Sequence, residues 1–228
     1  MKLNSDFTRR VAVHAAALTW VPSPMPGVER RMLERVGGEV ARATSIVRYA
    51  PDSHFSPHVH HGGEEFLVLD GVFQDEHGDY PAGSYLRNPP GSSHTPGSRP
   101  GCTIFVKLWQ FDPADRTSVR LRTGASTFLP DRMRDGVQKL LLHRDERESV
   151  WLEQWAPGTT VDADLPGGGE ILCLDGSFEQ GGEPFTESSW LRLPPGTHLQ
   201  ATAGITGARV WIKSGHLADV TEQLARLP

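Results

Sequence analysis

The stretch Pro57–Gly71, PHVHHGGEEFLVLDG, places three histidines and two glutamates within eight residues, directly ahead of an apolar run. His58 and His60 are two residues apart, and on a β-strand this spacing points both imidazoles to the same face. Gly62 and Gly63 then allow a tight backbone path before the apolar run begins. Two interpretations are open at this point: a metal-binding cage, or a polar loop that leads into an ordinary core strand.

The apolar half of this stretch recurs later in the chain. EEFLVLDGVF at 64–73 returns as GEILCLDGSF at 169–178, with six of ten residues identical. YLRNPPG at 85–91 returns as WLRLPPG at 190–196, also 105 residues later, with five of seven residues identical. A constant offset implies equal loop lengths and hence the same hairpins in both halves. The sequence therefore predicts two copies of one structural unit.

The composition of both copies is typical of an all-β fold. The 24 glycines and 18 prolines fall between short runs rich in β-branched and aromatic residues. In the first copy we expect strands at 44–49, 66–73, 84–88 and 103–109, with a hairpin loop at 75–79. Strands of this length pack in a small barrel or sandwich.

We expect two tandem barrels followed by a short helix. The first domain is predicted at 1–112, a polar linker at 113–128 and the second domain at 129–228. The C-terminal helix is predicted from four apolar residues at helical spacing, Leu217, Val220, Leu224 and Leu227.

A second polar pattern follows about thirty residues after the first. Gly83, Pro89 and Gly91 precede His94, and their Pro-Pro-Gly turn can bring His94 back across a barrel. Together with His58 and His60, this histidine completes a set of three imidazoles. Three imidazoles and one carboxylate form an ordinary ligand set for a divalent transition metal.

The two patterns resemble the paired signature of the cupin superfamily. The first signature is matched by His58, His60, Glu64 and Gly71, and the second by Gly83, Pro89, Gly91 and His94. The closing Asn of the second signature is replaced by Ser98, which does not affect the ligands. The resemblance implies that each copy is a jelly-roll barrel, also called a double-stranded β-helix, and that the first holds one metal ion.

Glu64 and Glu65 both fit the spacing of the carboxylate ligand. Glu64 keeps six residues to Gly71, whereas Glu65 recurs as Glu170 in the second copy, where the histidines are missing. We therefore predict His58, His60, Glu64 and His94 as the metal ligands. Phe66 and Val68 share strand parity with Glu64 and are predicted as a pocket wall.

The second copy lacks the predicted ligands in either register of the repeat. The corresponding residues are Ala163 or Asp164 for His58, Leu165 or Pro166 for His60, Gly169 for Glu64, and Leu199 or Gln200 for His94. We expect the second domain to be a degenerate cupin barrel without a metal site.

Within the cupins, residues 61–108 resemble the cupin half of the ChrR-type anti-sigma factors. That resemblance implies zinc binding, a response to oxidative signals and a sigma-factor partner. We expect no counterpart of the N-terminal helical zinc domain of that family in this stretch, because the first forty residues contain no cysteine. A regulatory, anti-sigma-type protein is therefore the alternative hypothesis.

The first copy also resembles cupins that cleave β-diketones with dioxygen. This resemblance implies a metal-dependent dioxygenase acting on a small carbonyl or diketone-like substrate, or a sensor of a small molecule or of redox state. Zinc, iron, manganese and nickel all suit this ligand set. An exposed barrel edge in each copy would also favour a homodimer.

Charge and cysteine content exclude several other classes. The net charge of −5 and the dispersed Lys and Arg residues argue against nucleic acid binding. Cys102 and Cys173 are isolated, so we expect no disulfide framework and a cytoplasmic location. Arg9-Arg10 ahead of an apolar run resembles an export signal, but Asp6 and His14 favour an ordinary first strand. No apolar run is long enough to span a membrane.

Overall fold

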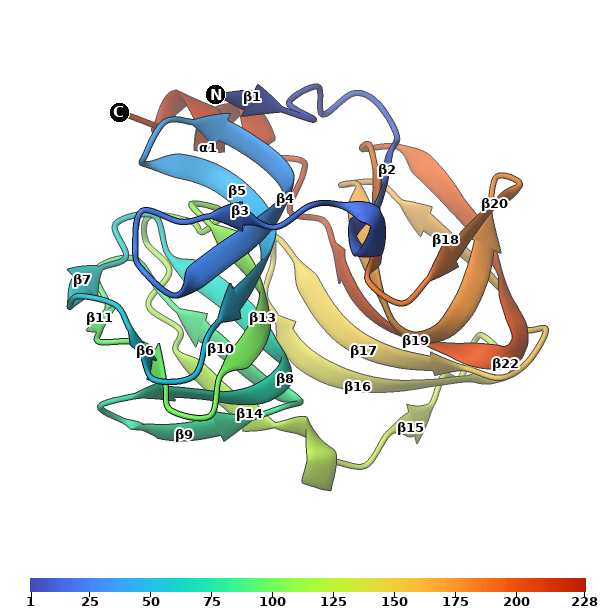
Figure 1. Cartoon of the computed structure of the whole chain (residues 1–228). Coiled ribbons are helices and arrows are strands. Elements are labelled where there is room, and N and C mark those ends of the chain that lie inside the picture. Colours follow the sequence, from blue (N-terminus) through green and yellow to red (C-terminus); the bar gives the residue numbers. More distant parts are fainter. The chain divides into compact units, whose positions relative to one another are not determined.

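The chain folds into two β-barrel units (Figure 1). The computed structural model describes residues 1–228, apart from the side chain of Ala125. The first unit comprises residues 1–5, 18–125 and 221–228, and the second comprises residues 6–17 and 126–220. The predicted all-β, two-barrel fold is confirmed.

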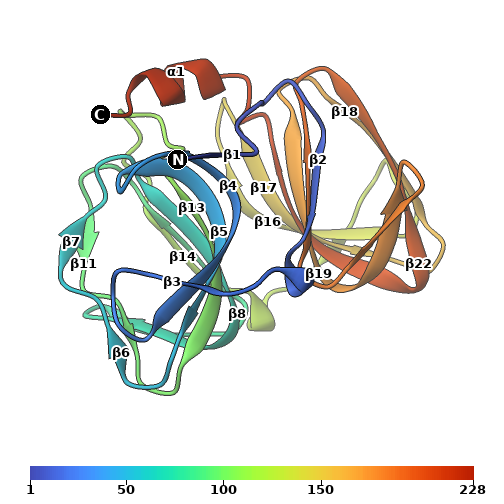
Figure 2. The ribbon, with the colours of Figure 1, turned by 45° about the horizontal axis from the view of Figure 1, so that its top comes forward.

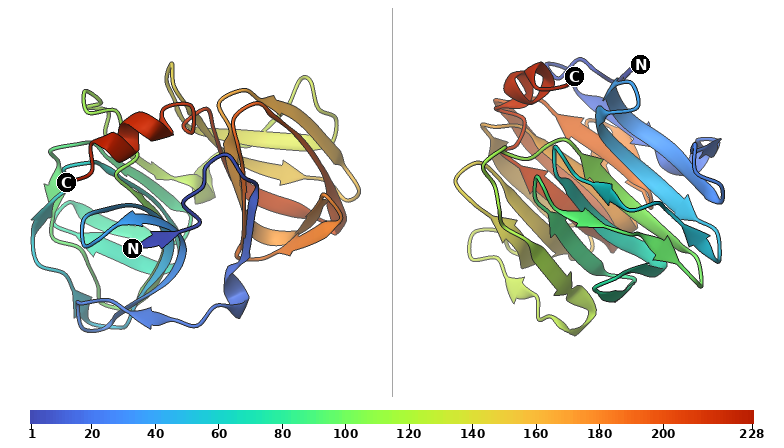
Figure 3. Two further views of the ribbon diagram at one scale, coloured as in Figure 1. Left: turned by 90° about the horizontal axis from the view of Figure 1, so that it is seen from above. Right: turned by 90° about the vertical axis from the view of Figure 1, so that its left-hand side faces the viewer.

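The first unit is built on one antiparallel sheet that curves into a barrel (Figure 3). Its strands lie in the order β1 (Lys2–Leu3), β4 (Val28–Gly37), β5 (Ala41–Tyr49), β13 (Cys102–Leu108), β8 (Glu64–Asp75), β10 (Ser84–Asn88) and β14 (Val119–Arg122). Short strands extend this sheet: β3 (Val21–Pro22) beside β4, β9 (Gly78–Pro81) beside β8, and β6 (Ser53–His54) beside β12 (Gly97–Ser98). The strands β7 (His58–Val59) and β11 (Ser93–His94) form a separate two-stranded sheet.

Strand β8 supplies the centre of the first core. Its side chains alternate, so Phe66 and Val68 point inward and are each only 1% exposed. They pack with Phe73 and with Ile104 and Val106 of β13. The pairing of β8 with β13 shifts register between Thr103 and Ile104, which marks a β-bulge in the barrel wall.

The second unit repeats this arrangement. Its strands lie in the order β15 (Leu129–Pro130), β16 (Val137–Arg144), β17 (Ser149–Trp155), β22 (Thr197–Ser214), β19 (Gly169–Gln180), β21 (Ser189–Leu193) and β2 (Val11–His14). The strand β18 (Thr160–Leu165) pairs with β22, and β20 (Glu183–Thr186) pairs with β19. Trp155, Phe178 and Phe185 lie in its core. Among the described residues, 3₁₀ turns lie at Ala15–Ala17 in this unit and at Thr123–Ala125 at the end of the first.

The internal repeat is visible strand by strand. Strands β8 and β19 each contain twelve residues and begin 105 residues apart. Gly71 and Gly176 occupy equivalent positions with φ of +70° and +67°. A Cβ at these positions would lie 2.1 Å and 2.2 Å from the carbonyl oxygens of Gly101 and Gly207. Glycine is therefore required in both copies by a left-handed backbone and by close contact with the neighbouring strand.

The C-terminal helix α1 (Val220–Ala225) is shorter than the predicted apolar pattern, which ran from Leu217 to Leu227. Its buried residue is the polar Gln223. The Oε1 atom of Gln223 accepts a hydrogen bond of 2.9 Å from Nε of the buried Arg42 on β5. Among the described residues, no helix is long and apolar enough to cross a membrane.

Candidate metal centre

The pairing of β7 with β11 brings the histidines of the two sequence patterns together. His94 lies directly opposite His58 in this antiparallel pair, which Figure 2 shows at one side of the first unit. His60 follows β7, and its backbone N–H donates to the carbonyl of Ser92 at 2.8 Å. Its carbonyl accepts from the backbone N–H of Gly91 at 3.0 Å, so the Pro-Pro-Gly turn fixes His60 against β11.

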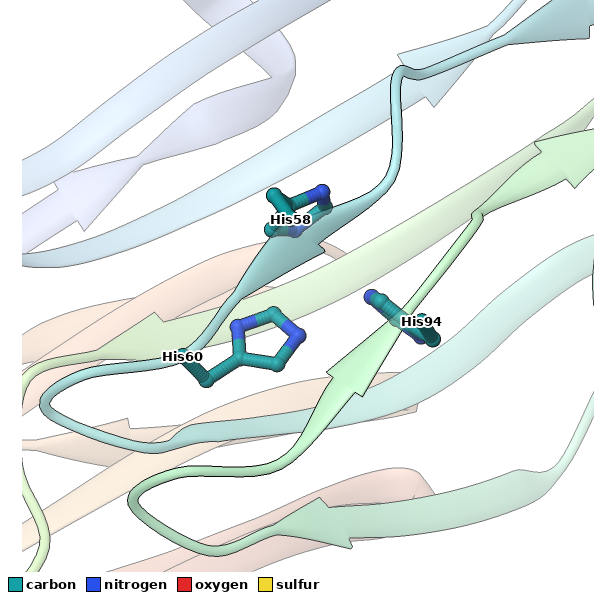
Figure 4. Close-up of side chains that lie close together, drawn as sticks. All are labelled: His58, His60 and His94. Atoms are coloured by element: carbon teal, nitrogen blue, oxygen red, sulfur yellow. The ribbon is translucent and has the colours of Figure 1, made fainter.

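The three imidazoles face a common space (Figure 4). One nitrogen from each of His58, His60 and His94 lies within 4.8 Å of the other two. Oε2 of Glu64, the first residue of β8, lies 3.4 Å from Nε2 of His60 and 3.5 Å from Nε2 of His94. The four residues predicted as ligands therefore converge, although they come from three separate segments of the first unit.

The buried nitrogens of this cluster lack hydrogen-bond partners. His60 and His94 are 6% and 4% exposed, and His58 is more accessible. Within the described part of the chain, neither Nε2 of His60 nor either nitrogen of His94 meets the criteria of a hydrogen bond. Unpaired polar atoms are costly to bury, and most buried polar groups in proteins have a partner. A metal ion would satisfy the two Nε2 atoms, so the donor set fits a divalent transition metal.

The surrounding groups shift the pKa values of the two buried histidines, His60 and His94, in opposite directions. Burial lowers the pKa of His60, and the nearby Glu64 only partly opposes this effect. For His94 burial also acts to lower the pKa, but Asp75 and Glu64 outweigh it and the pKa is raised. A neutral imidazole is the form that ligates a metal, so His60 is already in that form near neutral pH.

Two residues that support this cluster were not predicted from the sequence. Asn88, the last residue of β10, donates from Nδ2 to Oε2 of Glu64 at 3.0 Å. Asp75, whose side chain is fully buried, has Oδ2 3.5 Å from Nδ1 of His94. Contacts of this kind orient metal ligands. Comparison of the two copies could have identified both residues, because Asn88 and Asp75 are replaced by Leu193 and Gln180 in the copy that lacks the histidines.

Glu65 lies on the opposite face of β8 from Glu64. Its Oε1 accepts a hydrogen bond of 2.7 Å from the hydroxyl of Tyr85, and its Oε2 lies 3.6 Å from Nη1 of Arg87. The equivalent Glu170 accepts from the indole N–H of Trp190 at 3.1 Å. A buried carboxylate with buried donors thus recurs at this position in both units.

A cavity of about 310 Å³ opens beside the histidines. His58, His60, His61 and Glu64 contribute to its lining, together with apolar residues that include Val47, Ile104, Val106, Leu108 and Trp109. Phe66 and Val68, which were predicted as the pocket wall, lie in the core next to Ile104 and Val106 and are absent from this lining. His54 and His77 are exposed.

The two glycines of the opening stretch have a packing role at this cavity. A Cβ on Gly62 would lie 2.3 Å from the ring of Trp109, and one on Gly63 would lie 2.4 Å from the ring of Phe111. A side chain at Gly62 would displace the ring of Trp109, which borders the cavity, and one at Gly63 would displace the ring of Phe111.

The strand pairing of the second unit decides the register that the sequence left open. Ala163 on β18 opposes Leu199 on β22, as His58 opposes His94 in the first unit. At the same offset, His60 corresponds to Leu165 and Glu64 to Gly169. Leu165 and Leu199 are 7% and 2% exposed and belong to the apolar core. The region equivalent to the histidine cluster thus contains apolar side chains in place of the histidines.

Known proteins share features with this chain. Residues 8–112 match the family model of the ChrR cupin-like domain. No curated protein matches the sequence. A proposed dioxygenase from Nostoc punctiforme superposes with a TM-score of 0.73 at 14% identity, covering 92% of this chain and 84% of that one.

Two further solved structures are similar across both units. The Escherichia coli pirin YhhW, in complex with nickel(II), has a TM-score of 0.66 at 13% identity and covers 90% of this chain and 98% of its own. A mutant of Bacillus subtilis oxalate decarboxylase has a TM-score of 0.64 at 10% identity, covering 90% and 76%. With the repeat and the strand order, these likenesses identify the fold of both halves. The chain has the two-barrel cupin fold, and its residues 8–112, just under half of the chain, match the ChrR cupin-like domain.

Proposed function

We propose that the first unit binds one divalent transition metal ion through His58, His60, Glu64 and His94. We further propose that this centre performs dioxygenase-type chemistry on a small carbonyl or diketone-like substrate. The observation that carries the proposal is the convergence of buried imidazole nitrogens without hydrogen-bond partners beside a largely apolar cavity. The likeness to a proposed dioxygenase supports the reaction class.

The residues of the cavity suit such a substrate. A bound metal ion of this kind would supply a Lewis acid that polarises a carbonyl oxygen. Burial, reinforced by Glu64, raises the pKa of Tyr49 well above its ordinary value, so its hydroxyl stays protonated and can donate to a substrate oxygen. The apolar lining residues Val47, Ile104, Val106 and Leu108 would limit the access of water to the reacting groups. The ligand set accommodates zinc, iron, manganese or nickel.

Metal content tests the first part of the proposal. Elemental analysis of the purified protein after incubation with each metal should find about one ion per chain, as expected for a single site of this kind. His60→Ala should abolish stoichiometric binding because it removes a buried ligand. His77→Ala is the matched control, since His77 is an exposed histidine in the β8–β9 hairpin. Equal metal content in all three proteins, or none in the native one, would contradict the proposal.

Oxygen consumption tests the second part. The iron-loaded protein should consume dioxygen with at least one member of a panel of β-diketones and hydroxyketones, and His60→Ala should not. If the native protein holds metal but consumes no dioxygen with any panel member, the enzymatic proposal fails while the metal site stands.

A regulatory role is the second candidate, and the match of residues 8–112 to the ChrR cupin-like domain favours it. In that case the protein would bind a sigma factor and respond to redox state or to a small molecule at the metal centre. Affinity purification from cells grown with and without oxidative stress tests this role. Stoichiometric recovery of a sigma factor that depends on His60 would support regulation, and its absence would contradict it.

A further inference from the structure

The cavity beside the histidines contains a cationic side chain whose role the proposed metal centre does not explain. Arg30 on β4 contributes to the lining. It opposes Val47 of β5 and lies two residues from Val28, and both of these valines also line the cavity. Residues two apart on a strand, and residues opposite each other in a pair, project to the same side of the sheet. The side chain of Arg30 therefore projects to the cavity side of the barrel wall.

Its neighbour Arg31 projects to the other side. The guanidinium carbon of Arg31 lies 4.3 Å from the ring centroid of Trp20, and that of Arg48 lies 4.4 Å from the same ring. Arg48 also forms an ion pair of 2.6 Å with Glu29. The guanidinium groups on this other side of the two strands thus have an aromatic ring or a carboxylate as a neighbour.

Among the described residues, Arg30 has no comparable aromatic or acidic partner. Within the described part of the chain, the half-buried side chain of Arg30 forms neither a hydrogen bond nor an ion pair, and its Nε atom, like that of Arg31, is buried without a hydrogen-bond acceptor. Burying an unpaired cationic donor is unfavourable, and guanidinium groups pair strongly with carboxylates. A ligand in the cavity can supply the missing acceptor.

The charges around the cavity also favour an anionic ligand. A divalent ion with three neutral imidazoles and the Glu64 carboxylate would carry a net charge of about +1. Arg30 adds a second positive charge, and the exposed Glu39 at the cavity lining offsets only one of them. The cavity volume of about 310 Å³ is at the small end of ligand pockets.

We propose that Arg30 binds a carboxylate of the ligand, so that the substrates of this centre are small oxo acids in preference to neutral diketones. This inference rests on the proposed function, since it assigns a substrate class to the same cavity. Arg30 acts as a specificity-determining residue: its guanidinium holds the acid group and leaves the carbonyl oxygen facing the histidines.

Two ligands of the same size distinguish binding of a carboxylate by Arg30 from binding of any small molecule in the cavity. Acetoacetate and pentane-2,4-dione have the same number of non-hydrogen atoms, but only the first carries a carboxylate. Calorimetric titration of the zinc-loaded protein measures affinity without redox turnover. Arg30→Gln should weaken acetoacetate binding by roughly 10- to 100-fold, as expected for the loss of a charged hydrogen bond. Binding of pentane-2,4-dione should change by less than about twofold, because its two carbonyls need no cationic partner.

Two further variants complete the experiment. Arg31→Gln removes the same charge from the next residue of the same strand and should leave both affinities unchanged. Arg30→Lys keeps the charge but loses the planar, two-pronged geometry, so its affinity for acetoacetate should be intermediate. Circular dichroism and thermal melting of each variant confirm that the fold is retained.

The inference is overturned if native protein does not bind acetoacetate, if Arg30→Gln weakens both ligands equally, or if Arg31→Gln has the same effect. A different experimental result would show that the metal proposal is wrong. A protein that takes up no metal but binds acetoacetate in an Arg30-dependent manner would refute the metal centre and retain the role of Arg30. A metal-loaded protein that binds only the diketone would refute the role of Arg30 and retain the metal centre.

Discussion

The adjacent residues Glu64 and Glu65 have different roles, because successive side chains on a β-strand point to opposite faces. Glu64 faces the histidines and accepts a hydrogen bond from Asn88, whereas Glu65 faces Tyr85 and Arg87. In the second unit Glu65 has the counterpart Glu170, while Glu64 is replaced by glycine. Only the side chain that faces the cavity was lost with the histidines, which is what separate roles for the two carboxylates would produce.

Asn88 should tune metal affinity without being a ligand. We expect Asn88→Leu, which introduces the residue found at the equivalent position 193, to weaken metal binding by roughly 10- to 100-fold. The reason is that Glu64 loses the donor that fixes its Oε2 atom. Competition titration with a chromophoric chelator measures the affinity. Ser92→Ala serves as a control, because Ser92 bonds only the carbonyl of Pro89 through its hydroxyl. Unchanged affinity in Asn88→Leu would show that Glu64 needs no support.

The two cysteines should be inert in the native protein. Burial raises the pKa of Cys102 to about 11 and that of Cys173 to about 12. Both thiols are therefore protonated near neutral pH, and the thiolate is the reactive form. Ellman's reagent should modify neither cysteine in the native state and both in guanidinium chloride. Rapid modification of the folded protein would instead support a thiol-based redox sensor.

The strands that the sequence predicts best are those that recur in the second unit. The prediction for 84–88 agrees with β10, and the constant offset of 105 residues holds for β8 with β19 and for β10 with β21. Alternating apolar residues and turn-forming Gly and Pro specify such strands locally.

Contacts between distant segments could not be predicted in this way. The pairing of β2 (Val11–His14) with β21 joins residues almost 180 positions apart. The hydrogen bond from Asn88 to Glu64 and the inward direction of Arg30 likewise depend on strand order and register. Arg30 and Arg31 are identical neighbours in the sequence, and only pairing with β5 distinguishes them.

The glycine that recurs within β8 and β19 provides a test of the repeat at the level of strands. We expect Gly71→Ala and Gly176→Ala each to lower the free energy of unfolding by more than about 3 kcal/mol. A left-handed alanine costs about 1–2 kcal/mol, and overlap of its Cβ with a backbone oxygen adds to this cost. Gly181→Ala is the control: its φ is +63°, but its Cβ would meet nothing within 4 Å. Urea unfolding measures all three, and equal losses would show that close strand contact adds nothing.

The two units keep one fold with different interiors. In the first unit the pair His58–His94 and the carboxylate of Glu64 occupy the region that the second unit fills with Leu165, Leu199 and other buried apolar residues. The first interior leaves polar atoms unpaired, whereas the second gains apolar packing. Since unpaired buried nitrogens are costly, the first unit should gain more stability from a metal ion than the second.

Metal binding should therefore stabilise the protein through one set of histidines only. At a free metal concentration of about 100 times Kd, binding adds about 2.7 kcal/mol to the free energy of unfolding, so the melting temperature of the first unit should rise with metal concentration. His60→Ala should abolish the rise.

His198→Ala should leave that rise intact. His198 is the histidine that stands beside the equivalent position in the second unit, but its two ring nitrogens are already occupied by Asp162 and Asp164 at 2.8 Å each. Differential scanning calorimetry over a series of metal concentrations, with the stoichiometry from elemental analysis, makes the comparison. Two ions per chain, or a shift that disappears in His198→Ala, would place a metal site in the second unit and refute the division of roles between the two barrels.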